Sequence, residues 1–111
     1  MSELKITDTT VGDGKEAVKG ALLTMQYEGF LEDGTKFDSS YDRNKAFQFV
    51  IGSGRVIKGW DQGILGMKVG GKRTLHIPSE LAYGERQVGN LIPPNSNLIF
   101  HVELLEVLTR D

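Results

Sequence analysis

The sequence of 111 residues predicts an α+β fold, an antiparallel sheet of about five strands with one short helix packed on it. Two observations carry this prediction. Several short segments alternate apolar and polar side chains, whereas a single segment repeats apolar residues at helical spacing. The chain also has fourteen glycines, well above the usual share of about 7%, which indicates many tight turns between short elements. We expect one domain over residues 1–111.

The first strand is predicted over residues 23–28, where apolar and polar side chains alternate. Asp33-Gly34 follows, which is a strong hairpin signal, and residues 35–38 then form a short return strand. A polar loop over residues 39–45 leads into the apolar run 47–51, which we expect to be the next strand. This half of the chain therefore predicts sheet without helix.

The one predicted helix follows this strand. Four apolar residues recur there at spacings of three and four, which places them on one helical face: Ile57, Trp60, Ile64 and Met67. Three glycines in the same segment lower its intrinsic helix propensity. We therefore expect the helix to depend on packing against the sheet.

Two more strands are predicted after the helix. Leu75 and Ile77 alternate with polar residues, and Pro78 ends this strand. Residues 84–97 are rich in Gly, Asn and Pro and are expected to form a loop. Alternation over residues 98–105 then predicts the last strand.

The composition excludes several classes of function. The chain has no cysteine, which excludes thiolate catalysis, cysteine zinc ligands and disulfides. A net charge of −2 without a long basic run argues against nucleic acid as the main ligand. The sequence starts with polar residues and has no apolar run of about 18 residues, so neither a signal segment nor a membrane contact is expected. We expect a cytoplasmic protein.

A glycine-rich stretch, residues 66–73, matches a phosphate-binding loop up to its lysine. Arg73, however, stands where Ser or Thr should bind magnesium. The expected order is helix, turn, strand, the reverse of the arrangement in which helix amides face a phosphate. We interpret the stretch as a turn.

Histidine chemistry is not expected either. His76 and His101 fall on strand faces opposite the apolar ones, and His101 with Glu103 gives only two candidate metal ligands. Ser39 and Ser40 belong to a loop, which gives no basis for a hydrolase triad. We therefore predict no metal site and no cofactor.

Two further groups of residues are candidates for chemistry. Asp38 directly follows Phe37, and Arg43 is near enough to hold this carboxylate ionised, although the same pattern also fits a strand end with a capped loop. Trp60 alone is compatible with an ordinary core position. Aromatic residues are spread over several predicted elements and would line an apolar pocket if they converge: Tyr27, Phe37, Phe47, Phe49, Trp60, Tyr83 and Phe100.

Seven motifs in register resemble the FKBP-type peptidyl-prolyl cis–trans isomerases over residues 20–107. They are Tyr27-x-Gly29, Asp33-Gly34-x-x-Phe37-Asp38-Ser39-Ser40, Val56-Ile57-x-Gly59-Trp60-x-x-Gly63, Met67-x-x-Gly70, Ala82-Tyr83-Gly84, Ile92-Pro93-Pro94-Asn95 and Phe100-x-Val102-Glu103-Leu104. Each motif alone is weak, but their order and spacing together are specific. The chain resembles the minimal, single-domain form.

The resemblance implies a twisted antiparallel sheet wrapped around the helix, with a pocket whose floor is Trp60. The residues it implies for catalysis are Asp38, Tyr83, Trp60, Phe37 and Phe100. Those it implies for binding substrate or macrolide are Tyr27, Phe47, Val56, Ile57 and Ile92. Departures from frequent family choices at Ala46, at Leu81 and over residues 85–88 border the pocket and leave substrate preference and macrolide affinity open.

The implied activity is rotation of X–Pro bonds in peptides and unfolded proteins, by desolvation and hydrogen bonding of the twisted imide. The alternative is a non-catalytic module that binds proline-containing segments or macrolides. Retention of both Asp38 and Tyr83 favours catalysis. The expected partners are proline-containing peptides or folding proteins, and macrolides such as rapamycin, bound by a monomer.

Overall fold

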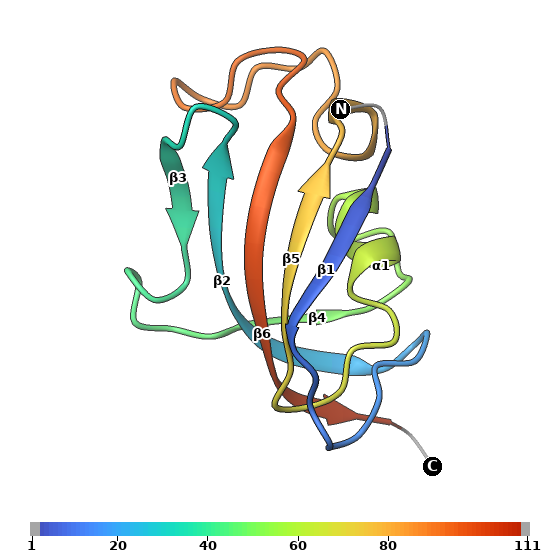
Figure 1. The fold of residues 1–111 in the computed structure, drawn as a ribbon. Coiled ribbons are helices and arrows are strands. Elements are labelled where there is room, and N and C mark those ends of the chain that lie inside the picture. The colour runs from blue at the N-terminus through green and yellow to red at the C-terminus, as the bar shows by residue number, and fades with distance from the viewer. Residues whose placement is uncertain (1–2, 110–111) are drawn as a thin grey trace.

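The computed structural model describes residues 3–109 and contains one six-stranded sheet and one short α-helix (Figure 1). The elements are β1 (Lys5–Thr10), β2 (Leu22–Leu31), β3 (Lys36–Ser39), β4 (Phe47–Val50), α1 (Lys58–Gly63), β5 (Lys72–Ile77), the 3-10 turn η1 (Ser79–Leu81) and β6 (Leu98–Leu108). The predicted α+β class is thereby confirmed.

The sheet has the strand order β1-β5-β6-β2-β3, and every pairing is antiparallel. The long strand β2 has two partners on its free side: β4 pairs with Leu22–Met25, and β3 pairs with Glu28–Phe30. Figure 1 shows β2, β6, β5 and β1 side by side in one curved layer, with α1 on the side of β5 and β1. This division of β2 leaves β3 and β4 separated, and the candidate site forms between them and the helix.

Strand β1 was not among the predicted strands. All six of its residues are exposed, although they pair with β5 from Lys5 opposite His76 to Thr10 opposite Lys72. Alternation of apolar and polar residues signals a half-buried strand. An edge strand exposed along its whole length lacks that signal, which is why the prediction stopped at about five strands.

The hairpin between β2 and β3 is present where Asp33-Gly34 predicted it. Gly34 adopts a φ of 93°, which glycine reaches without steric cost, and its amide donates to the Leu31 carbonyl at 3.0 Å. The Asp33 carboxylate accepts a hydrogen bond from the Thr35 amide at 2.9 Å. The turn thus fixes the register that places β3 beside the site.

Helix α1 is shorter than the apolar spacing suggested, because it ends at Gly63 and Ile64 already forms its C-cap. Three residues of the predicted apolar face are nevertheless buried: Trp60, Ile64 and, in the following turn, Met67, whereas Ile57 is only partly buried. Gly59 and Gly63 lie directly against side chains of β5. A Cβ atom on Gly59 would lie 2.5 Å from Ile77 Cγ2, and one on Gly63 would lie 2.9 Å from Leu75 Cδ2.

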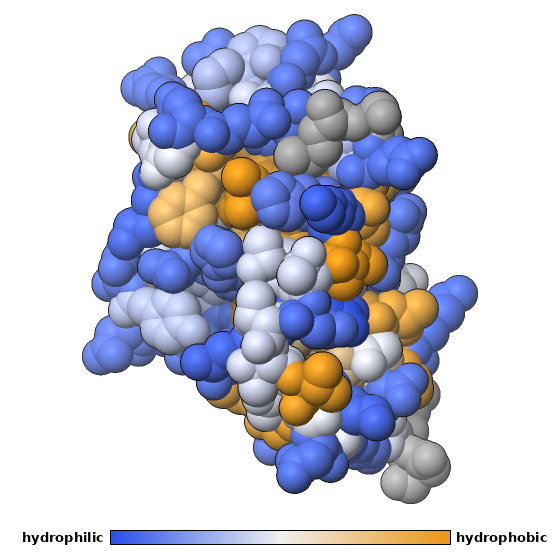
Figure 2. Space-filling view, viewed as in Figure 1, coloured by the Kyte–Doolittle hydropathy of each residue, from blue (hydrophilic) through white to orange (hydrophobic). Residues whose placement is uncertain are grey.

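The core lies between α1 and the inner face of the sheet, and it includes fully buried side chains from β2, β5 and β6, such as Leu23, Leu75 and Leu98. The outer face is different. Figure 2 shows mostly hydrophilic and weakly polar side chains there, with apolar atoms in separate patches. No helix within residues 3–109 is long and apolar enough to cross a membrane.

Candidate active site

A cavity of about 380 Å³ lies above the Trp60 indole. Its walls come from β2, β3, β4, β6, the segment before α1 and the loop after β5: Tyr27, Phe37, Asp38, Phe47, Arg55, Val56, Ile57, Trp60, Tyr83 and Phe100. The structure therefore brings together all predicted site residues except Ile92. Residues up to 73 positions apart in the sequence, Tyr27 and Phe100, are neighbours here.

The floor of the cavity is a cluster of aromatic rings around Trp60, which is only 5% exposed. Its indole contacts Tyr27 edge-on, with ring centroids 4.9 Å apart, and Phe100 and Phe47 at 5.1 and 5.6 Å. The indole Nε1 is buried and has no hydrogen-bond partner among the described residues. A buried donor without a partner costs stability. Because this N–H is fully buried, the floor presents ring carbons to a ligand rather than a polar contact.

One wall is the edge-to-face pair of Phe37 and Phe100, with centroids 5.6 Å apart and an interplanar angle of 89°. Gly29 on β2 lies opposite both Asp38 and Phe100 in the sheet register. A Cβ atom on Gly29 would lie 2.7 Å from each of the two phenyl rings. The glycine of the Tyr27-x-Gly29 motif therefore makes room for this wall, a role that the motif alone did not reveal.

The Asp38 carboxylate is held by three donors. The Tyr27 hydroxyl donates to Oδ2 at 2.5 Å and the Ser39 amide donates to Oδ1 at 2.8 Å, while the Arg43 guanidinium forms an ion pair with Oδ1. Arg43 Nη2 also donates to the Tyr27 hydroxyl at 2.8 Å. The expected pairing of Arg43 with Asp38 is thus present, and it fixes the carboxylate at the cavity wall.

Ser40 bears on the alternative interpretation of the Asp38 segment, in which these residues form a strand end followed by a capped loop. Its side chain is fully buried, its hydroxyl oxygen accepts from the Tyr27 amide at 2.7 Å, and its own amide donates to the Tyr27 carbonyl at 2.9 Å. The polar loop after β3 is therefore tied to β2 directly beneath the site. The strand end with a capped loop is thus present, and the same turn places Asp38 beside Tyr27, while the functional interpretation of Asp38 stays a prediction.

Two tyrosines of the cavity keep their protons well into the alkaline range. Burial, and secondarily the nearby Asp38 charge, raises the pKa of Tyr83 above its ordinary value. Burial also raises the pKa of Tyr27, and its hydrogen bond to Asp38 adds to this effect. Both phenols are therefore hydrogen-bond donors at neutral pH.

Two positions differ from the other candidate site residues, Ile92 and Arg55. Ile92 is not among the residues that line the cavity; it packs into the core, is 4% exposed, and its amide donates to the Val88 carbonyl at 3.2 Å. Its part in binding a ligand stays a prediction. Arg55 lines the cavity but was not predicted. The available signal was its position directly before Val56 and Ile57 in the same motif.

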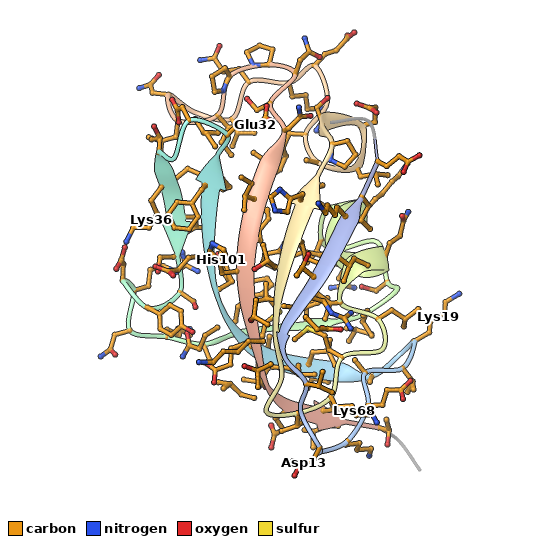
Figure 3. The ribbon with its side chains drawn as sticks, in the orientation of Figure 1. Asp13, Lys19, Glu32, Lys36, Lys68 and His101 are labelled. Atoms are coloured by element: carbon orange, nitrogen blue, oxygen red, sulfur yellow. The ribbon has the colours of Figure 1, made fainter. Side chains whose placement is uncertain are left out.

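The rejected alternatives lie elsewhere. His101 extends from β6 on the outer face (Figure 3), where its Nδ1 lies 3.0 Å from the Thr74 hydroxyl and its ring packs edge-on against Phe30. Residues 3–109 contain no group of three or more His, Asp or Glu side chains that could hold a metal ion. Arg73 pairs with Asp8 at 2.7 Å, and the glycine-rich turn before it leads into β5.

The chain thus combines an antiparallel sheet over a short helix with an aromatic cavity and one fixed carboxylate. Residues 13–105 match the family described as FKBP-type peptidyl-prolyl cis-trans isomerase. The chain therefore belongs to this family and is a peptidyl-prolyl cis–trans isomerase.

Known proteins are similar to this chain in sequence and in structure over nearly its whole length. An FK506-binding protein from Neisseria meningitidis serogroup A is 58% identical over 107 residues, which span 96% of this chain and 98% of the relative. The crystal structure of AtFKBP13 superimposes with a TM-score of 0.88 at 51% identity, covering 95% of this chain and 93% of that one. FkpA from Escherichia coli gives a TM-score of 0.87 at 41% identity, and the match covers 97% of this chain but 49% of FkpA.

Proposed function

We propose that X–Pro bonds rotate in the cavity above Trp60, with Asp38 and Tyr83 acting on the twisting amide. One observation carries this proposal. The cavity is open and apolar at its floor, and it also holds a carboxylate fixed by Tyr27, Ser39 and Arg43. Such a site can change the polarity around an amide without a nucleophile or a metal.

The physical basis is the loss of amide resonance during rotation. Resonance flattens the X–Pro amide and gives a barrier of about 18–20 kcal/mol. The twisted amide has lost resonance, so its carbonyl oxygen is less polar and is less penalised by a dry surface. An aromatic cavity therefore binds the twisted state better than the planar one, which is preferential transition-state binding. The ring cluster of Trp60, Phe37 and Phe100 supplies this surface.

The required rate enhancement is moderate. Uncatalysed exchange takes tens to hundreds of seconds, or roughly 0.01 per second. Acceleration to about 100 per second corresponds to four decades and about 5.5 kcal/mol of barrier lowering. Desolvation, two or three oriented hydrogen bonds and positioning of the substrate are together sufficient for such an effect.

Two donors would orient the bound segment. The Tyr83 hydroxyl carries its proton at neutral pH, as an ordinary phenol does, and burial raises its pKa further. The Ile57 amide lies at the N-cap of α1, where backbone N–H groups have no partner within the helix. With these donors at the wall and Asp38 facing the amide, the proline ring would rest on the Trp60 indole. Val56, Phe47 and Tyr27 would surround it.

The ligands and the state of the protein are also part of this proposal. We expect macrolides such as rapamycin to bind the same cavity, which the names of the FK506-binding relatives support. The natural partners would be proline-containing peptides or folding proteins. We propose a cytoplasmic monomer, and the mostly hydrophilic face drawn in Figure 2 supports the monomeric state. One relative, FKBP13 of Arabidopsis thaliana, is chloroplastic, so the location has to be measured in cells.

The test is a measurement of cis–trans exchange by NMR on a short proline peptide, together with titration of Trp60 fluorescence by rapamycin. We expect accelerated exchange, and a change in indole emission as the macrolide fills the cavity. The same macrolide should inhibit the exchange in proportion to its occupancy. Binding without any acceleration would favour the non-catalytic module. Acceleration that persists when the indole signal shows the cavity filled with rapamycin would place the reaction outside this cavity.

A further inference from the structure

Arg55 lies where the cavity continues into a second depression. The second groove, of about 520 Å³, runs along β4 and the segment that follows it, and it shares Phe47, Arg55 and Val56 with the cavity. The rest of its lining is Leu22, Gln48, Phe49, Val50 and Ser53. We call this second depression the β4 groove. A peptide whose proline occupies the cavity can therefore continue past Arg55 into the β4 groove.

The two charged residues that line the cavity differ in whether they have an ion-pair partner. Of the residues that line it, Asp38 and Arg55 carry a charge, and the Asp38 carboxylate is already paired with Arg43. Arg55 is exposed and forms no ion pair or side-chain hydrogen bond with any residue in the range 3–109. The cavity rim therefore presents one guanidinium free to bind a ligand group.

The nearest acidic residue in the sequence does not neutralise Arg55. Both oxygens of Asp61 accept backbone hydrogen bonds, Oδ1 from the Gly52 amide at 2.8 Å and Oδ2 from the Gly54 amide at 3.1 Å. These bonds fasten the segment before Arg55 to α1, so its backbone is held while its side chain stays free. A guanidinium on a fixed backbone is well suited to bind a carboxylate in a bidentate manner.

We propose that Arg55 determines specificity, favouring substrates that carry an acidic side chain within two residues of the isomerised proline. This inference rests on the proposed function, since it assumes that the proline occupies the cavity above Trp60. An extended peptide advances about 3.3–3.6 Å per residue. A side chain one or two residues from the proline therefore reaches the wall that the cavity and the β4 groove share.

The expected preference is modest. Ion pairs between exposed groups contribute little, and their measured range corresponds to a change of about 1.4- to fivefold in kcat/KM. Salt screens such pairs strongly, so the preference should shrink at high ionic strength. Because this interaction selects among peptides, it should change the ratio between substrates more than the rate on any one of them.

The experiment uses four peptide series around one X–Pro bond. Glu, Gln or Lys is placed in turn at each of the two positions before and the two positions after the proline, and kcat/KM is measured by NMR exchange. We expect the Glu peptide to exceed the Lys peptide by about two- to fivefold in at least one series at low salt. The Glu-to-Lys ratio should fall to about one in Arg55→Gln, reverse in Arg55→Glu, and be largely kept in Arg55→Lys.

Lys58→Gln is the matched control, because Lys58 is an exposed cation on α1 that does not line the cavity. We expect this variant to keep both the rate and the Glu-to-Lys ratio of the parent protein. Equal rates for Glu and Lys peptides in all four series would overturn the proposal, as would a preference that survives in Arg55→Gln. A protein that turns over no peptide would overturn the proposed function together with this inference.

Discussion

Helix α1 makes two contacts that differ sharply in packing. Toward β5, Gly59 and Gly63 bring the helix backbone so close that an added Cβ would clash with Ile77 or Leu75. Next to this contact, Trp60 of the same helix supports an open cavity of about 380 Å³. This six-residue helix thus contributes both to the close-packed contact with β5 and to the open cavity above Trp60.

The difference shows how a small domain keeps a cavity open. Open apolar surface forfeits packing contacts, so side chains around a hollow tend to collapse into it unless their positions are fixed. Here the glycine contacts fix the helix on the sheet, and the Phe37–Phe100 pair fixes the opposite wall beside Gly29. The close-packed contact is therefore expected to govern stability, and the hollow to govern activity.

The largest expected effect is on the hollow side. Trp60→Ala removes the floor of the cavity and its edge-on contacts with Tyr27 and Phe100. The proline ring would lose the apolar surface beneath it, and burial of such a side chain is worth about 1.5–3 kcal/mol. We therefore expect kcat/KM to fall by about tenfold or more, and rapamycin binding to weaken in parallel. NMR exchange and calorimetry measure the two effects. Trp60→Phe, which keeps a ring, should retain more activity; full turnover in Trp60→Ala would exclude the indole as the floor.

The next effect is on the packed side. Gly59→Ala forces a methyl group against Ile77, and such overpacking costs about 1–3 kcal/mol, offset by about 1 kcal/mol of better helix propensity. We expect a lower free energy of unfolding in urea. At temperatures where the variant is folded, we expect activity to change little. Gln62→Ala on the exposed side of α1 is the control, with unchanged or slightly raised stability. Unchanged stability in Gly59→Ala would show that the helix can shift.

Asp38→Ala should reduce kcat/KM by several-fold, on the order of 1 kcal/mol of barrier, while the fold is preserved. The variant removes the acceptor of the buried Tyr27 hydroxyl and of the exposed Arg43 guanidinium, and it leaves the α1–β5 contact intact. Exchange rates and circular dichroism measure the outcome. Asp42→Ala, which removes a carboxylate paired with Lys36 outside the cavity, serves as the control. If Asp38→Ala keeps full turnover, the carboxylate has no part in rotation.

The smallest expected effect concerns pH. Burial raises the pKa of Tyr27 and Tyr83 above their ordinary value of about 10. Above that pH the phenols ionise first in the unfolded chain, which then binds fewer protons than the folded one, so stability should fall as pH rises. We expect no such loss from these phenols between pH 7 and about 9.5, and a smaller loss above it in Tyr83→Phe. Urea unfolding measured between pH 7 and about 11 tests this prediction. If the free energy of unfolding falls with pH equally steeply in Tyr83→Phe and in the parent protein, the prediction is wrong.

Local patterns in the sequence predicted most of the strands and most of the candidate site residues. Alternating side chains marked β2, β5 and β6 because each is half-buried, and Asp33-Gly34 marked its hairpin because the turn needs a positive φ that glycine adopts freely. The site residues were found through motifs that keep their spacing, so nearly all of them line one cavity. Local signals failed for β1, which is exposed throughout and shows no alternation.

Tertiary structure decided the rest, because periodicity reports whether a residue is buried and not which segment covers it. In the sequence, Gly59 only lowers the helix propensity of its segment. In the fold, the close contact with Ile77 leaves no room for a side chain at this position. Ile92 and Arg55 lie in segments without regular structure, and only the folded chain turns the first into the core and the second toward the cavity. The residue types come from the sequence, whereas their convergence around Trp60 comes from long-range packing.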